Sequence, residues 1–273
     1  MTWEETVIHF RSQPKNKQIS RDAYLEEDLI DNIERFKNSE EWAETFKEIS
    51  SLIPNKKTIK VLDIGAGNGI SSLAFALNGY EVTALEPDTS NTVGSGAIKF
   101  LASHYKLNNI TIIEAFGENL PFEDESFDIV YGRQVMHHAH HLDNFLKEAA
   151  RVLKKGGFLM TVRDHVIKDK KDKELFLKSH PLHEYYGGEN AFLFREYEGA
   201  ILNANLIIKK ILSPSQSTIN YSPWSKKRVS ELITNKFGKS FCNLITVNLL
   251  WKVNQYRLET LPGKLYSFIA LKE

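Results

Sequence analysis

The chain has 273 residues, of which 42% are hydrophobic and 26% charged, so it is long enough for one mixed domain with a cap or an insertion. Basic and acidic residues number 35 each, and this balance argues against a general nucleic-acid binder, which needs a basic excess. The single cysteine, Cys242, excludes an intrachain disulfide framework and a multi-cysteine zinc site. Because neither a signal-peptide pattern nor a run of about 18 apolar residues is visible, we expect a cytoplasmic protein without a membrane span.

Residues 1–58 precede the first expected strand and are predicted to form an N-terminal helical cap. Apolar side chains recur there at three- to four-residue spacing, which indicates amphipathic helices over residues 22–36 and 39–52. Two positions for these helices stay open: they cover one edge of a sheet, or they also form the roof of the active site.

From residue 59 onward, short apolar runs alternate with helical periodicity. Repeated strand–helix units of this kind predict an α/β fold with a Rossmann-like, doubly wound sheet and helices on both faces. Ligands bind such sheets at the carboxyl ends of the strands, where the winding reverses. The expected strands are 59–64, 81–86, 110–114, 127–131 and 157–163. One expected helix follows the first strand and ends at residue 78, and two others span 89–107 and 142–153.

The order loosens after Asp164. Residues 165–191 read as a polar loop with one short helix over 173–178. A helix over 195–204 and strands over 206–212 and 265–270 follow, so that the sheet has seven strands in all. We therefore expect one binding domain made of residues 59–213 and 263–273. Residues 214–262 are a helical insertion with seven basic and several aromatic side chains. This insertion either packs on the sheet edge or covers the site of a small-molecule substrate.

The stretch VLDIGAGNGI, residues 61–70, combines a buried strand with a glycine turn. Glycines at 65, 67 and 69 let the backbone bend sharply and let a ligand approach where a Cβ would clash. The dinucleotide fingerprint requires a further glycine at position 70, where this chain has Ile70. A nicotinamide-dependent oxidoreductase is therefore disfavoured.

This glycine turn, with Asp63 two residues before it, resembles the first motif of the class I S-adenosylmethionine-dependent methyltransferases. The resemblance continues through FGENLPF, FEDESFDIVYGRQVMHH and FLKEAARVLKKGGFL, and it covers about residues 59–163. It implies S-adenosylmethionine as the cofactor and an antiparallel last strand at the sheet edge. The chain departs from the family at Phe116, where many members carry an acidic residue directed at adenine.

Glu86 ends the second expected strand, and its carboxylate can accept hydrogen bonds from both ribose hydroxyls of the cofactor. The resemblance implies that Asp63 helps to hold the amino-acid end of the cofactor. It also implies that the segment around Phe116 and Gly117 binds the adenine. The full set of predicted cofactor-binding residues is Asp63, Gly65, Ala66, Gly67, Asn68, Gly69, Glu86, Pro87, Phe116, Gly117, Glu118, Arg133 and Gln134.

The methyl acceptor is predicted to be a small molecule and not a nucleic acid. Tyr131-Gly132-Arg133-Gln134 lacks the Asn/Asp-Pro-Pro-aromatic sequence typical of enzymes that methylate nucleobase amino groups, and Cys242 lies in an apolar run that suits a structural thiol. We expect in-line transfer to oxygen or nitrogen by a monomer or homodimer. The alternative is a catalytically silent module that only binds S-adenosylmethionine.

Methyl transfer needs mainly positioning, and a hydroxyl acceptor also benefits from a base with a pKa near neutrality. The predicted catalytic residues are His137, His138, His165 and Arg133. The loop over 180–192 is interpreted as a lid or a plain connector. Imidazoles can bind transition metals, but no carboxylates stand at an obvious position to complete a site, so the sequence predicts no metal. The histidines considered were 137, 138, 140, 141, 165, 180 and 183.

Overall fold

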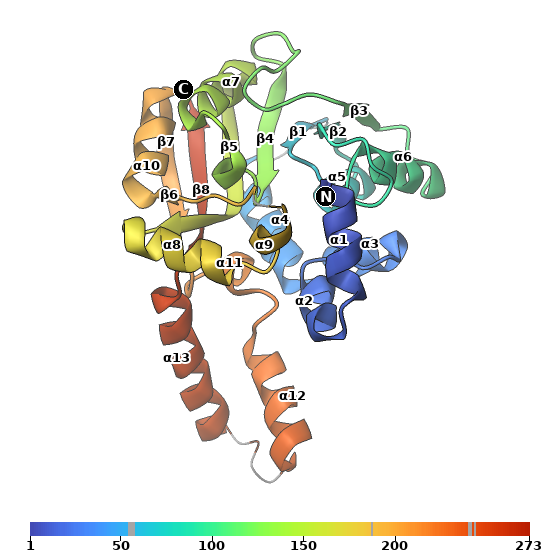
Figure 1. Ribbon diagram of the computed structural model, residues 1–273. Coiled ribbons are helices and arrows are strands. Elements are labelled where there is room, and N and C mark those ends of the chain that lie inside the picture. Colours follow the sequence, from blue (N-terminus) through green and yellow to red (C-terminus); the bar gives the residue numbers. More distant parts are fainter. Residues whose placement is uncertain (54–57, 187, 240–241, 243) are drawn as a thin grey trace.

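A computed structural model describes residues 1–53, 58–186, 188–239, 242 and 244–273. Its centre is an eight-stranded sheet of order β3-β2-β1-β4-β5-β8-β7, with β6 beside β5 (Figure 1). The strands are β1 Lys60–Ile64, β2 Glu81–Leu85, β3 Ile110–Ile113, β4 Phe127–Arg133, β5 Leu153–Ile167, β6 Phe192–Leu193, β7 Leu206–Leu212 and β8 Lys264–Lys272. β8 runs antiparallel to β5 and β7, and the other pairs are parallel. The predicted Rossmann-like fold is confirmed, but the predicted seven strands become eight, because the two-residue strand β6 pairs with the end of β5.

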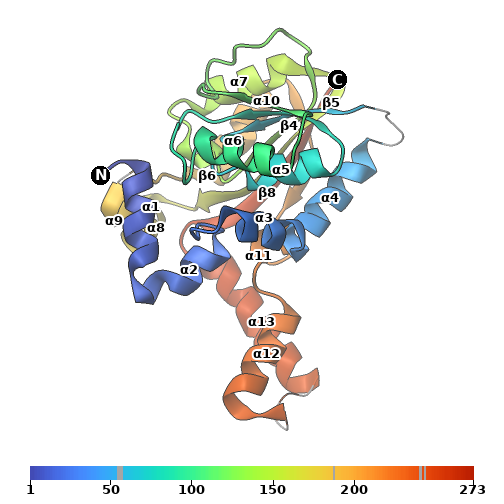
Figure 2. The same cartoon turned by 90° about the vertical axis from the view of Figure 1, so that its right-hand side faces the viewer.

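Helices cover both faces of the sheet (Figures 1 and 2). α5 (Ile70–Leu77), α6 (Ser95–His104) and the N-terminal helices pack on one face, while α7 (Leu142–Val152) and α10 (Phe194–Asn203) pack on the other. The central strands are therefore buried on both sides, which is why β1 reads as an almost continuous apolar run.

Four α-helices form the N-terminal region instead of the two that were predicted. α1 (Trp3–Ser12) and α2 (Lys17–Asp22), separated by a 3₁₀ turn over Pro14–Asn16, were missed. The helix predicted over 22–36 was wrong at its start, because the carboxylate of Asp28 accepts the N–H of Asp31 and begins α3 (Leu29–Lys37) there. α4 (Glu40–Leu52) agrees with its prediction.

Two further element boundaries differ from those expected. The helix predicted over 89–107 begins only at Ser95, whose N–H donates to the Asp88 carbonyl in the preceding turn. β5 is longer than the predicted 157–163, because β8 pairs with it as far as Val166. Two short helices follow it, α8 (Lys170–Ser179) and α9 (His183–Tyr186).

The insertion consists of α11 (Thr218–Tyr221), α12 (Lys226–Phe237) and α13 (Leu244–Thr260). α12 and α13 lie side by side and project away from the sheet in both views (Figures 1 and 2). Their shared core is small, and an ion pair of 2.9 Å joins Arg228 to Asp22 at the end of α2. Among the described residues, no helix is both long enough and apolar enough to cross a membrane.

A buried ion pair joins the N-terminal helices to the sheet. Nε and Nη2 of Arg133, at the end of β4, donate to the two carboxylate oxygens of Glu41 on α4, at 2.7 and 3.2 Å. The side chains are only 11% and 2% exposed. Burial by itself would raise the pKa of Glu41, but Arg133 and Arg163 lower it, and the net shift is downward.

We expect Glu41→Ala to lower the free energy of unfolding by about 3–5 kcal/mol, because it leaves a buried guanidinium uncompensated. Glu44→Ala, on the same helix, is the matched control. Its partner Lys47 is 75% exposed, so the expected loss is at most about 1 kcal/mol. Urea unfolding of both variants checks the difference, and equal losses would contradict the importance of the buried pair.

Candidate active site

The glycine turn after β1 has the backbone geometry that its sequence predicts. Gly65, Gly67 and Gly69 have φ of 67°, 56° and 86°, in the left-handed region that favours glycine. The turn is held against the end of β2, because the N–H groups of Gly65 and Ala66 both donate to the Leu85 carbonyl, at 2.8 and 3.0 Å. A Cβ at Gly67 would meet only the Val93 carbonyl, at 3.9 Å, so the space above this residue is open.

Two buried carboxylates flank the turn. Asp63 accepts a hydrogen bond from the Ser72 hydroxyl on one oxygen, while its Oδ1 has no partner and the residue lines a cavity. Glu86 accepts the N–H groups of Gly67 and Asp88, at 2.7 and 2.9 Å. Burial raises the pKa of each carboxyl to about 7, and Glu86 contributes further to the raised pKa of Asp63.

The cavity has a volume of about 240 Å³ and lies at the carboxyl ends of β1 and β4. Its floor is the glycine turn, and its roof is made of side chains from the N-terminal helices and the turn after them. The roof therefore comes from α1, α2 and the turn before α3, and no residue of α3 or α4, the helices predicted to cover the sheet edge or roof the site, lines the cavity. The roof residues are Trp3, Phe10, Ile19, Ala23 and Leu25.

The cavity brings together ten of the predicted site residues, and the other six do not line it. Those that line it are Asp63, Gly65, Ala66, Gly67, Asn68, Arg133, Gln134, His137, His138 and His165. Those that do not are Gly69, Glu86, Pro87, Phe116, Gly117 and Glu118.

The predicted adenine segment lies close to the end of β1. A Cβ at Gly117 would come within 3.0 Å of the Ile64 side chain, which shows how close this loop is to the glycine turn. Phe116 is 59% exposed, and its ring lies 6.4 Å from the His140 ring in a T-shaped arrangement. The carboxylate of Glu118 accepts the N–H of His140 at 2.8 Å and so ties this loop to the one after β4.

Arg133 and Gln134 line the cavity, but their polar groups are already engaged. Besides its pairing with Glu41, Arg133 donates from Nη1 to the Gln134 side-chain oxygen at 2.8 Å. Its guanidinium also lies over the ring of Tyr24, 5.7 Å from the centroid. In this arrangement Arg133 holds the wall of the cavity in position.

A 3₁₀ turn over Met136–His138 presents two histidines to the cavity. The Asp164 carboxylate anchors this turn, because its Oδ1 lies 3.2 Å from the backbone nitrogen and 3.0 Å from Nδ1 of His137. Burial raises the pKa of Asp164 to about 8, whereas burial and the neighbouring imidazoles keep the pKa of His137 well below its usual value. A register shift between Thr161 and Asp164 in β5, with Arg163 at a φ of 62°, precedes this carboxylate.

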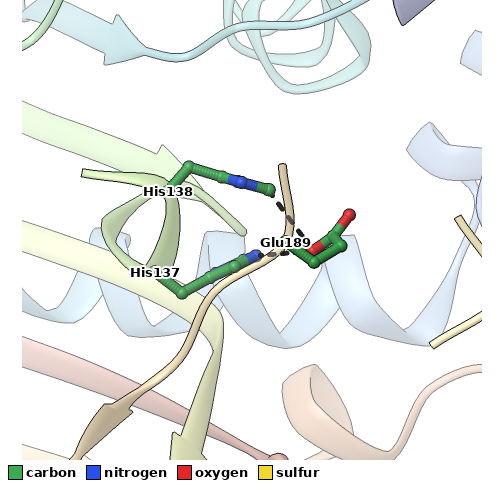
Figure 3. A group of neighbouring side chains, drawn as sticks. All are labelled: His137, His138 and Glu189. Carbon is green, nitrogen blue, oxygen red and sulfur yellow. Dashed lines mark ion pairs between the residues drawn. The ribbon is translucent and has the colours of Figure 1, made fainter. Parts of the chain in front are cut away.

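Glu189 completes the cluster from a distant loop. Its carboxylate lies 3.9 Å from Nε2 of His137 and 3.8 Å from Nε2 of His138 (Figure 3). It also lies 3.6 Å from Nδ1 of His180. The side chain is 6% exposed, and burial raises the pKa of Glu189 to about 7. His165 lies next to this group, 4.9 Å from the His137 ring, and its Nδ1 is hydrogen-bonded to the Gly263 carbonyl at 2.6 Å.

The loop that carries Glu189 closes against α1. The rings of Trp3 and Tyr186 are 5.3 Å apart, and those of His9 and Tyr185 are 5.2 Å apart. Both views show α9 next to α1 (Figures 1 and 2). Within the described ranges, no residue of the 214–262 insertion lines the cavity, whereas α1, residues 180–182 and Glu189 do, and they form part of its cover.

Sequence reasoning missed three carboxylates of the site, namely Glu41, Asp164 and Glu189. A signal existed for Asp164, which stands directly before the predicted base His165. Glu189 lies in the loop over 180–192 and Glu41 in the helix expected over 39–52, but no local pattern indicates that either side chain faces the site.

Residues 62–161 match a family model described as a methyltransferase domain. This segment is a class I S-adenosylmethionine-dependent methyltransferase domain. The prediction from the glycine turn is therefore confirmed for this part of the chain. Outside it, this methyltransferase domain is extended by the N-terminal helices, the loop that carries Glu189 and the insertion.

Two curated relatives match part of the chain. Over 104 residues the chain is 34% identical to phthiotriol/phenolphthiotriol dimycocerosates methyltransferase 1 of Mycobacterium ulcerans. This match covers 38% of this chain and 36% of that protein. Over 106 residues it is 37% identical to the uncharacterized methyltransferase YcgJ of Bacillus subtilis, covering 39% and 40%. The chain thus matches well under half the length of either relative.

The geranyl diphosphate C-methyltransferase of Streptomyces coelicolor A3(2), solved with Mg²⁺, geranyl diphosphate and S-adenosyl-L-homocysteine, has a similar fold. The TM-score is 0.59 at 15% identity, and the match covers 85% of this chain and 79% of that chain. At this identity the likeness concerns the fold of the methyltransferase domain.

We expect Gly65→Ala to destabilise the domain more than Gly79→Ala. Both positions have a positive φ, which costs an alanine about 1–2 kcal/mol. Only at Gly65 would the Cβ also meet a neighbour, the Val135 side chain at 2.4 Å, whereas Gly79 faces open space. Urea denaturation should give an additional loss of about 1–3 kcal/mol for Gly65→Ala, the scale of overpacking. Similar losses in both variants would contradict the close packing of the turn.

Proposed function

We propose that the chain is a methyltransferase that transfers the methyl group of S-adenosylmethionine to an oxygen or nitrogen of a small-molecule acceptor. The observation that carries the proposal is that the glycine turn and the histidine cluster line one cavity under a helical roof. A donor and an acceptor bound there would be adjacent. Positioning two reactants in this way supplies a large part of the rate of a displacement reaction.

The cofactor end of the cavity offers groups that suit S-adenosylmethionine. The unpartnered Oδ1 of Asp63 is an acceptor for the amino group, and the open space at Gly67 admits the ligand against the backbone. Glu86 can exchange its bonds to the Gly67 and Asp88 amides for the ribose hydroxyls. The exposed ring of Phe116 is available to stack on adenine.

The cofactor, when bound, supplies a methyl group on a positively charged sulfur that needs no further activation. The residues of this chain then have to hold the acceptor in line and accept its proton. All three predicted bases have a partner near Nδ1: Asp164 for His137 at 3.0 Å, the Gly263 carbonyl for His165 at 2.6 Å and the Gly188 carbonyl for His138 at 3.4 Å, the longest of the three. The His138 side chain is 42% exposed, whereas that of His137 is 2% exposed, and His138 lies next to Glu189. Among the three predicted bases, His138 is therefore the one proposed to accept the proton of the acceptor.

Calorimetric titration of the purified chain with S-adenosylhomocysteine and with NAD tests the proposal. We expect S-adenosylhomocysteine to bind and NAD not to bind, because Ile70 breaks the dinucleotide fingerprint. A screen of small-molecule acceptors with labelled S-adenosylmethionine then separates an enzyme from a silent binding module. The opposite ligand ranking, or no transfer to any acceptor class, would count against a methyltransferase.

The affinity for S-adenosylhomocysteine should depend on pH through Asp63 and Glu86. Both carboxyls must be ionised to accept hydrogen bonds from the ligand, and in the free protein each has a pKa of about 7. Affinity should therefore rise with pH up to about 7, by at most about tenfold per unit for each carboxyl, and level off above it. Calorimetry between about pH 5.5 and 8.5 measures this, with Glu86→Gln expected to flatten the profile. A flat profile for the unmodified chain would contradict these roles.

His138→Ala should lower kcat on the identified acceptor by about 10²–10⁴-fold, the usual contribution of a general base. Its affinity for S-adenosylhomocysteine should stay unchanged. His141→Ala is the matched control, since His141 is exposed and does not line the cavity. Unchanged turnover in His138→Ala would remove this residue from the mechanism.

A further inference from the structure

The group formed by His137, His138 and Glu189 has an arrangement that hydrogen bonding alone does not explain. One nitrogen of each histidine and a carboxylate oxygen all lie within 4.8 Å of one another. The two nitrogen–oxygen separations are 3.9 and 3.8 Å, which is too long for a hydrogen bond. Ligands about 2.1 Å from one metal ion at tetrahedral angles lie about 3.4 Å apart. A small contraction of the group would therefore enclose an ion.

The proton on His137 is on the side that metal binding requires. The Asp164 oxygen that faces Nδ1 of His137 also faces the backbone N–H of the same residue, so this oxygen acts as an acceptor for both. Nδ1 therefore carries the proton, and the lone pair of Nε2 points toward Glu189 (Figure 3). A carboxylate that orients a histidine in this way is typical of zinc sites.

Glu189 lacks the strong cation that a buried carboxylate usually pairs with. Its side chain is 6% exposed, and the ion pairs found for it within the described residues are all with imidazoles. His180 lies 3.6 Å from its other oxygen, and Nδ1 of His180 is buried without a hydrogen-bond partner. A buried carboxylate facing neutral imidazoles is a donor set that a divalent cation would neutralise.

We propose that His137, His138 and Glu189 bind one divalent transition-metal ion of the Zn²⁺ type, and that an oxygen of the methyl acceptor occupies an open position on it. Two histidines and one glutamate leave coordination positions free for substrate, as in catalytic zinc sites. The part that concerns the acceptor rests on the proposed function. With the ion bound, Nε2 of His138 would be a ligand and could not act as the base; the ion would instead lower the pKa of the bound acceptor hydroxyl, so that its proton leaves to water before the oxygen accepts the methyl group.

The test is a Zn²⁺ titration of the chelator-treated full chain, followed by calorimetry and by metal analysis after dialysis. The unmodified chain should retain one equivalent. Glu189→Gln and His137→Ala should retain none, and Asp164→Asn should bind about 10–100-fold more weakly because the orientation of His137 is lost. His141→Ala should behave like the unmodified chain, and a Co²⁺ titration should give a visible absorption band that Glu189→Gln lacks.

Failure of this inference is distinguishable from failure of the proposed function. No retained Zn²⁺ in the unmodified chain, or equal retention in Glu189→Gln, would overturn the metal site. S-adenosylhomocysteine binding, measured on the same samples, reports on the methyltransferase assignment independently. Loss of turnover on chelation that Zn²⁺ restores in the unmodified chain would support the role in acceptor binding. Turnover that survives complete removal of metal would overturn that role.

Discussion

A single buried carboxylate connects the parts of the chain that surround the cavity. Glu41 on α4 pairs with Arg133 at the end of β4, and Arg163 in β5 lies 3.6 Å from it. Arg163 also donates to the carbonyls of Ile219 and Ser222, both at 2.7 Å, and so reaches the start of the insertion. Because an unpaired charge in such a place is costly, the N-terminal helices, two central strands and α11 are held in one relative position.

The parallel order of β1, β4 and β5 explains why the glycine turn and the histidine cluster lie close together. β1, β4 and β5 are neighbours in the sheet and run in the same direction, so their carboxyl ends share one edge. β1 brings the glycine turn to this edge, β4 brings the turn with His137, and β5 brings Asp164. The register shift in β5 lies directly before Asp164, in agreement with the frequent use of bulges to direct side chains at functional sites.

The two sides of the cavity have different origins in the chain. The cofactor side is built within the matched methyltransferase domain, over residues 62–161. Part of the cover comes from α1, residues 180–182 and Glu189, which lie outside that domain, and α1 contacts Tyr185 and Tyr186 of α9 through aromatic rings. His137 and His138, which are proposed to act on the acceptor, lie within that domain, whereas Glu189, which faces them, lies outside it. This division agrees with the general rule that function depends on the site and not on the fold alone.

The sequence by itself determined the features that depend on neighbouring residues. The glycine turn and the alternation of strands and helices follow from spacing and backbone preference, and they predicted the fold. The cofactor class followed from the resemblance of residues 59–163 to a known family. Only the tertiary structure decided which carboxylates lie next to the predicted histidines. Glu189 is separated from His137 by 52 positions, from 137 to 189, and Asp164 lies on another strand. No local pattern encodes contacts of this kind, because they depend on the length of β5, on its pairing with β8 and on the packing of a loop against α1.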